Sequence, residues 1–156
     1  MKKIFEGQRS QDCWWPNGYS VRSHKIVLAD LTKLTSNIVE KVDQQSKTIL
    51  SMRKTLLLDT PHYQYAIGNK QPYSEYLSML KHITWARAAI NQEHLDLKFM
   101  FDKYDKILHS EDEYLQPPYE QKYIICDSTG LIQDGLHRAT VLLSNSILRA
   151  PVAMVR

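Results

Sequence analysis

Residues 130–143, GLIQDGLHRATVLL, place an acidic residue, a glycine and two basic residues at the start of an apolar-periodic run. The Asp134–Gly135 pair predicts that a short strand ends here and a helix begins. The first turn of a helix has N–H groups pointing outward and the positive end of the helix dipole, so it attracts anions. Because His137 and Arg138 are electrostatically unfavourable in such a turn unless an anion binds, the segment predicts an anion site.

The four side chains suit phosphate chemistry. Arg138 can grip phosphate oxygens through its fork of donors, and His137 can add a further donor or a charge. Gly135 permits a tight turn or a close approach of the backbone to a ligand. Asp134 has three interpretations: it caps the helix, holds a divalent cation against the phosphates, or acts as a base toward an attacking hydroxyl.

Each assignment has a purely structural alternative. For Asp134 the alternative is the capping role alone, which is common for an aspartate before a helix. For Arg138 it is a surface ion pair with a carboxylate such as Glu111 or Glu113. For His137 it is a buried, hydrogen-bonded imidazole.

A second candidate group lies in residues 59–77, DTPHYQYAIGNKQPYSEYL, which we interpret as a loop leading into a helix. His62, Tyr63 and Tyr65 can hydrogen-bond a sugar or stack on a base, and Lys70 adds a mobile cation. In the structural alternative the two tyrosines pin the loop onto the sheet, and His62 caps an element or faces solvent.

Strands and helices around these residues follow from periodicity and turn residues. A β-branched apolar run predicts a strand at 24–31, and apolar spacing favours a helix within 35–52. Two further helices are predicted after Pro72 and around 97–108. Residues 122–135 are typical of a hairpin, followed by a short helix and a final strand at 150–155. The expected apolar face of the helix after Pro72 comprises Tyr73, Tyr76, Leu77, Leu80 and Ile83.

Composition is that of an ordinary globular domain, with 156 residues, 43% hydrophobic and 24% charged, which excludes disorder as the default. The net charge of +3 is too small to indicate nucleic acid by itself, although residues 1–54 are the most basic part. The two cysteines, Cys13 and Cys126, have no metal-ligand spacing, and neither a secretory signal nor a membrane span is evident. We therefore expect a cytoplasmic protein with reduced thiols.

Residues 123–155, YIICDSTGLIQDGLHRATVLLSNSILRAPVAMV, resemble the C-terminal half of the ParB/sulfiredoxin superfamily fold, and HKIVLADLTKL is similar to its opening strand. The resemblance implies an α+β fold, a small mixed sheet with helices inserted in the middle of the chain. It implies a single domain over residues 1–156, with core strands at about 24–31 and 122–156 and a helical insertion at about 36–110.

In that superfamily the glycine turn binds nucleotide phosphates, which implies phosphate contacts here at Gly135, His137, Arg138, Ala139 and Thr140. The implied cofactors are ATP and Mg²⁺, with Asp134 as the metal ligand and with Asp134 and His137 as catalytic residues. Leu136 stands where sulfiredoxins carry their catalytic cysteine, so reduction of sulfinic acid is not expected. Sequence-specific DNA binding of the kind found in chromosome-partitioning proteins is likewise not expected, because the helix-turn-helix module that follows this domain in those proteins has no room here.

Some members of the superfamily are ATP- or ADP-dependent kinases of small molecules, and residues 59–77 resemble small ParB-like proteins of bacterial polysaccharide biosynthesis. We therefore expect an ATP-dependent kinase of a small hydroxylated or sugar acceptor, which His62, Tyr63 and Lys70 contact. The alternative is a non-catalytic module or nuclease that binds a nucleotide or nucleic acid. A third possibility is an inactive relative that works through protein partners.

Overall fold

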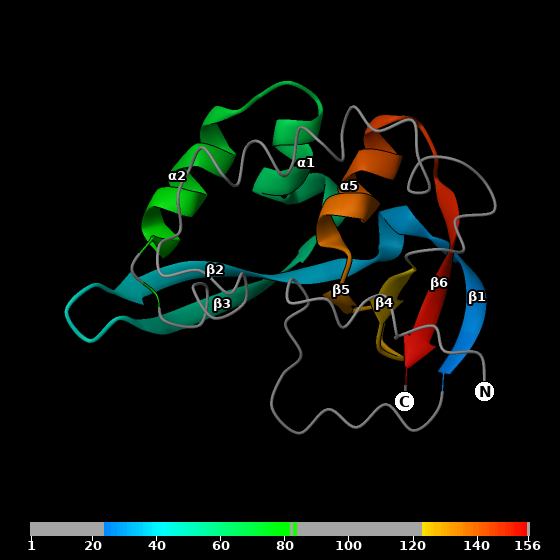
Figure 1. Cartoon of the computed structure of the whole chain (residues 1–156), viewed down its shortest axis with the longest axis horizontal. Helices are drawn as coiled ribbons and strands as arrows, with labels where there is room; N and C mark the ends of the chain where they lie inside the picture. Colours follow the sequence, from blue (N-terminus) through cyan, green and yellow to red (C-terminus); the bar gives the residue numbers. More distant parts are fainter. Residues whose placement is uncertain (1–23, 82, 84–122, 156) are drawn as a thin grey trace.

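The computed structural model describes residues 24–81, 83 and 123–155. Within them the chain forms a four-stranded sheet, a separate two-stranded hairpin, and helices lying over both (Figure 1). The strands are β1 (His24–Asp30), β2 (Thr35–Asp43), β3 (Thr48–Leu56), β4 (Ile124–Cys126), β5 (Ile132–Asp134) and β6 (Arg149–Val155). The α-helices are α1 (Pro61–Ala66), α2 (Gln71–Leu80) and α5 (Leu136–Ser144), and short 3-10 turns occupy Leu31–Lys33 and Leu57–Asp59. The expected α+β class is confirmed at this level.

The four-stranded sheet has the order β1-β6-β4-β5. Strand β6 pairs antiparallel with β1 and parallel with β4, so Val152 lies between Val27 and Ile124. Strands β4 and β5 form an antiparallel hairpin. Three sequence predictions are confirmed here: the opening strand, the hairpin within 122–135 and the closing strand.

The helix predicted within residues 35–52 is wrong, because β2 and β3 form an antiparallel hairpin there. Two register shifts at Lys41 interrupt the ladder, and beyond them Val42 packs against the same apolar cluster as Val39. The bulge thus lets a buried and a partly buried residue of one strand face the same cluster at the three-residue spacing of a helix. Asp43 accepts hydrogen bonds from the N–H groups of Gln45 and Ser46 in the connecting turn.

The first half of the expected helical insertion at 36–110 is therefore this hairpin together with α1 and α2. Helix α1 begins at Pro61, and the Thr60 hydroxyl before it accepts a hydrogen bond from the Tyr63 N–H at 3.1 Å. The helix predicted after Pro72 is confirmed as α2. Of its expected face, Tyr73, Leu77 and Leu80 are buried and Tyr76 is partly buried, whereas Ile83 is buried beyond the end of the helix. The helix predicted around 97–108 lies outside the described residues.

Two apolar clusters form the core. The first joins the four-stranded sheet to α5 and includes Val152 and Leu142. The second joins the hairpin to α1 and α2 and includes Val39 and Tyr73. Helix α5 belongs to both, since its Val141 lies in the second cluster. The glycine turn that begins α5 is thus attached to a helix that both clusters hold.

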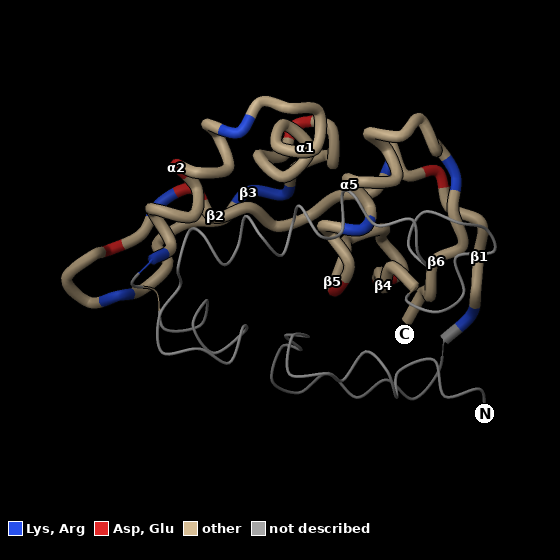
Figure 2. The backbone as a smooth tube through the Cα atoms, turned by 45° about the horizontal axis from the view of Figure 1, so that its top comes forward, with Lys and Arg blue, Asp and Glu red and all other residues tan. Residues whose placement is uncertain are grey.

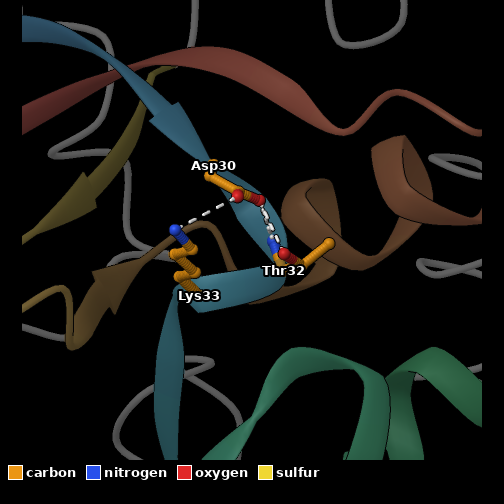
Figure 3. A network of polar contacts seen from close by, with 3 residues as sticks. All are labelled: Asp30, Thr32 and Lys33. Atoms are coloured by element: carbon orange, nitrogen blue, oxygen red, sulfur yellow. Dashed lines mark hydrogen bonds and ion pairs between the residues drawn. The ribbon is translucent and has the colours of Figure 1, made fainter.

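A small polar network redirects the chain where β1 ends (Figure 3). Asp30 Oδ1 accepts hydrogen bonds from the N–H and the hydroxyl of Thr32, at 3.0 and 2.6 Å, and Lys33 Nζ lies 3.9 Å from Oδ2. The hydroxyl bond of Thr32 is the main cause that holds the pKa of Asp30 below its usual value. The network fixes the turn between the sheet and the hairpin. In the described part of the chain, the helices are too short or too polar to span a membrane.

Candidate functional site

The predicted glycine turn forms the N-terminus of α5. Gly135 is the N-cap residue, with φ 92° and ψ 22°, and its carbonyl accepts the N–H of Ala139 at 2.9 Å. Asp134 is the last residue of β5, one position before the cap. The capping interpretation of Asp134 is therefore wrong, because a glycine without a side chain occupies the capping position. The first turn of α5 contains no acidic residue.

Arg138 is paired inside this turn. Its Nη2 lies 3.3 Å from Asp134 Oδ2 and donates to the carbonyl oxygen of Tyr123 at 3.1 Å. The two charged side chains are only 13% and 16% exposed. The expected partners Glu111 and Glu113 lie outside the described residues. Arg138 is therefore not the open cationic clamp that its position suggested, and its contact with a phosphate stays a prediction.

Gly135 is required by its neighbours as well as by its backbone angle. A Cβ at this position would lie 2.9 Å from Arg138 Nη2 and 3.1 Å from the Cα of Ile124 in β4. Both distances are shorter than ordinary contacts, and a positive φ is itself unfavourable for other residues. The glycine thus lets the guanidinium pass directly over the turn.

Ala139 and Thr140 lie one turn inside the helix and are fully buried. The N–H of Ala139 bonds to Gly135, and the Thr140 hydroxyl donates to the carbonyl oxygens of Leu136 and His137 at 3.1 and 3.0 Å. These donors are committed to the helix. The N–H groups that point out of the helix end belong to residues 136–138, which are the better candidates for a phosphate.

The side chain of His137 joins an aromatic cluster formed by α1, α2 and α5. Its Nε2 lies 2.9 Å from the hydroxyl oxygen of Tyr73, a fully buried residue of α2. The ring of His62, from α1, lies with its centroid 4.9 Å from each of the other two rings. The structure thus brings together residues predicted for two different roles, His137 for catalysis and His62 for the acceptor.

Tyr73 is the site residue that sequence reasoning missed. The sequence predicts it on the apolar face of α2, and its burial confirms that prediction. A buried phenol needs a polar partner, and the hydroxyl of Tyr73 finds that partner in His137. Tyr73 therefore does more than pack. The signal available in the sequence is the hydroxyl-bearing tyrosines, Tyr73 and Tyr76, within an apolar stripe that is predicted to be buried.

His62 does not stand in a loop, as predicted, but on α1, with its ring buried. Burial lowers the pKa of His62 to about 3, so the ring is neutral at physiological pH. Tyr76 packs its ring edge against His62 at 5.5 Å, and burial raises the pKa of Tyr76 to about 12. His62 therefore packs against the ring of His137 from within the protein, and its contact with an acceptor stays a prediction.

The other two predicted acceptor residues lie elsewhere. Tyr63 packs against the first apolar cluster, as the structural alternative for this tyrosine required. Lys70 is exposed and places its Nζ 5.2 Å from the centroid of the Tyr65 ring, which in turn contacts the ring of Tyr73 at 5.2 Å. Of the predicted acceptor residues, His62 is the one that contacts His137.

For a metal, the described residues contain no group of three or more His, Cys, Asp or Glu side chains able to hold an ion. Mg²⁺ commonly takes one or two carboxylates and completes its shell with phosphate oxygens and water. Asp134 can supply the one carboxylate that such a site needs. Cys126 is buried, and desolvation raises the pKa of its thiol to about 11. It therefore stays protonated and unreactive.

Comparison of the chain with family models, curated proteins and solved structures found no match.

Proposed function

We propose that the chain binds a nucleotide with Mg²⁺ at the N-terminus of α5 and transfers a phosphoryl group to a small hydroxylated or sugar acceptor. The observation that carries this proposal is the glycine-capped start of α5, with His137 and Arg138 in a first turn that has no acidic residue. A helix N-terminus of this composition suits a polyanionic ligand. The resemblance to the ParB/sulfiredoxin superfamily supports the same ligand.

Phosphoryl transfer depends mainly on positioning and on stabilisation of charge on the transferred group. The first-turn N–H groups and His137 supply donors on one side. Asp134, held in place by its ion pair with Arg138, supplies the carboxylate that orients an acceptor hydroxyl or a metal ion bound to the phosphates. Mg²⁺ would contribute neutralisation of phosphate charge when bound.

The first experiment is a thermal-shift screen of ATP, ADP and GTP, each with and without Mg²⁺. A ligand that binds the folded state raises the Tm by mass action. We expect a Mg²⁺-dependent rise with at least one nucleotide. A flat response to all of them at millimolar concentration would refute the proposal.

The second experiment places a negative charge in the first turn with His137→Glu. A glutamate there is compatible with the helix dipole but repels a phosphate. We expect at least a tenfold loss of nucleotide affinity, measured by calorimetry, with helical circular dichroism retained. Lys54→Gln, at an exposed position of β3, changes the net charge by the same amount and should leave affinity unchanged. Equal affinities for the two variants would place the nucleotide elsewhere.

A second candidate function is nucleotide binding without turnover. The pairing of Asp134 with Arg138 at 3.3 Å favours it, because the predicted base already has a cationic partner. ADP formation from ATP, with and without a panel of sugars and amino alcohols, separates the two functions. Nucleic acid is the less favoured ligand, because the Lys and Arg residues of the described ranges are spread over several elements and interspersed with acidic residues (Figure 2).

A further inference from the structure

The contact between Tyr73 and His137 joins two helices whose residues are 64 positions apart in the chain. Tyr73 is fully buried, whereas His137 is half-buried at the start of α5. The phenol oxygen lies 2.9 Å from Nε2, within the range of a good hydrogen bond. The buried hydroxyl of Tyr73 therefore hydrogen-bonds one ring nitrogen of His137.

The direction of this hydrogen bond depends on the charge of His137 and on which ring nitrogen carries the proton. The ring belongs to the first turn of α5, where the helix dipole opposes a positive charge. The rings of His62 and Tyr73 pack against it and reduce its contact with water, which also disfavours the charged form. A neutral imidazole carries one proton and accepts at its other nitrogen. When the phenol donates to Nε2, the ring proton resides on Nδ1.

We propose that Tyr73 is a positioning residue for His137: its hydroxyl donates to Nε2, fixes the orientation of the ring and keeps the proton on Nδ1, so that His137 serves the bound phosphate as a neutral donor. The role toward the bound phosphate rests on the proposed function. The orientation of the ring and the position of its proton concern the protein without ligand. His62 completes the arrangement because its ring packs 4.9 Å from both partners.

The test compares Tyr73→Phe with Tyr76→Phe in the full chain. Both tyrosines lie on α2 and both rings contact His62, but the Tyr76 hydrogen bond is to the backbone of Val39. Long-range ¹H–¹⁵N spectra of the labelled protein show which ring nitrogen carries the proton, and His137→Gln assigns the signals. Calorimetry with ATP and Mg²⁺ measures affinity.

In the unmodified chain we expect an unprotonated Nε2 on His137. Tyr73→Phe should move the proton toward Nε2 and weaken ATP binding about fivefold to tenfold, the effect of one positioned hydrogen bond. Tyr76→Phe should change neither the tautomer of His137 nor the affinity for ATP. Circular dichroism should confirm that both variants fold.

Two results would overturn the inference: a proton on Nε2 in the unmodified chain, or a Tyr73→Phe variant with the same tautomer and the same affinity. If the unmodified chain fails to bind ATP, the proposed function is wrong, yet the spectra of the free protein still decide whether Tyr73 sets the tautomer. The two failures are therefore distinguishable.

Discussion

At the scale of single residues, the N-terminus of α5 depends on a glycine and an ion pair that hold each other in place. Gly135 leaves space for the guanidinium of Arg138, and Arg138 links Asp134 in β5 to the carbonyl of Tyr123 before β4. The residues predicted to bind a ligand thus also connect a strand to a helix. Their substitution should change stability as well as binding.

Gly135→Ala should lower the free energy of unfolding by about 2–3 kcal/mol, because a Cβ meets Arg138 and Ile124 and the residue keeps a positive φ. Gly68→Ala is the matched control. Gly68 also has a positive φ, but a Cβ there meets nothing within 4 Å, so only the backbone cost of about 1 kcal/mol applies. Urea denaturation measures both, and equal losses would show that the contacts at Gly135 are unimportant.

Arg138→Ala should destabilise the fold by about 1–3 kcal/mol, since it leaves the carboxylate of Asp134 largely buried without this partner. Arg53→Ala provides the comparison. Arg53 and Glu40 lie at the same 3.3 Å separation but are 67% and 41% exposed. Such a surface pair contributes under about 1 kcal/mol. A loss at Arg138 no larger than at Arg53 would contradict the structural role of the buried pair.

At the scale of secondary-structure elements, the β2–β3 hairpin places the second apolar cluster under α1 and α2. Its turn is closed by Lys47, which has φ 56°, a left-handed conformation that is uncommon for lysine. Lys47 is therefore held in a backbone conformation that costs free energy.

Lys47→Gly should therefore raise the free energy of unfolding by about 0.5–1 kcal/mol, because glycine adopts a positive φ without strain. Lys54→Gly, within β3, should lower it by about the same amount, because glycine weakens a strand. Thermal unfolding followed by circular dichroism measures both. A destabilising effect of Lys47→Gly would mean that side-chain contacts of Lys47 contribute more free energy than its positive φ costs.

At the scale of the whole molecule, α5 connects the two apolar clusters, and the ring of His62 is enclosed where α1, α2 and α5 meet. Burial lowers the pKa of His62 from 6.5 to about 3, so the folded chain resists protonation there while the unfolded chain accepts it. The stabilising contribution of this neutral ring is complete above about pH 6.5 and is lost progressively as the pH falls toward 3.

The free energy of unfolding should consequently fall by up to about 1.4 kcal/mol per pH unit, or about 2 kcal/mol between pH 6.5 and 5. His62→Gln removes this titrating group and should flatten the dependence in that range. Urea denaturation at several pH values gives both slopes. Parallel slopes for the two proteins would show that His62 is not the group responsible.

The sequence by itself determined the features that depend on neighbouring residues. The β4–β5 hairpin, the start of α5 at a glycine turn, the apolar face of α2 and the strands β1 and β6 all follow from local periodicity and turn residues. Short-range backbone preferences and burial of one face decide such elements, and both are legible in a few consecutive residues.

Only the tertiary structure decided what distant residues do together. The bulge at Lys41 sets the register of β2 against β3, and no local pattern distinguishes its spacing from that of a helix. The partner of Arg138 and the approach of His62 and Tyr73 to His137 depend on how α1, α2 and α5 pack. Side-chain contacts between separate elements form only when the chain is folded, so the chemistry of the site had to be read from the structure.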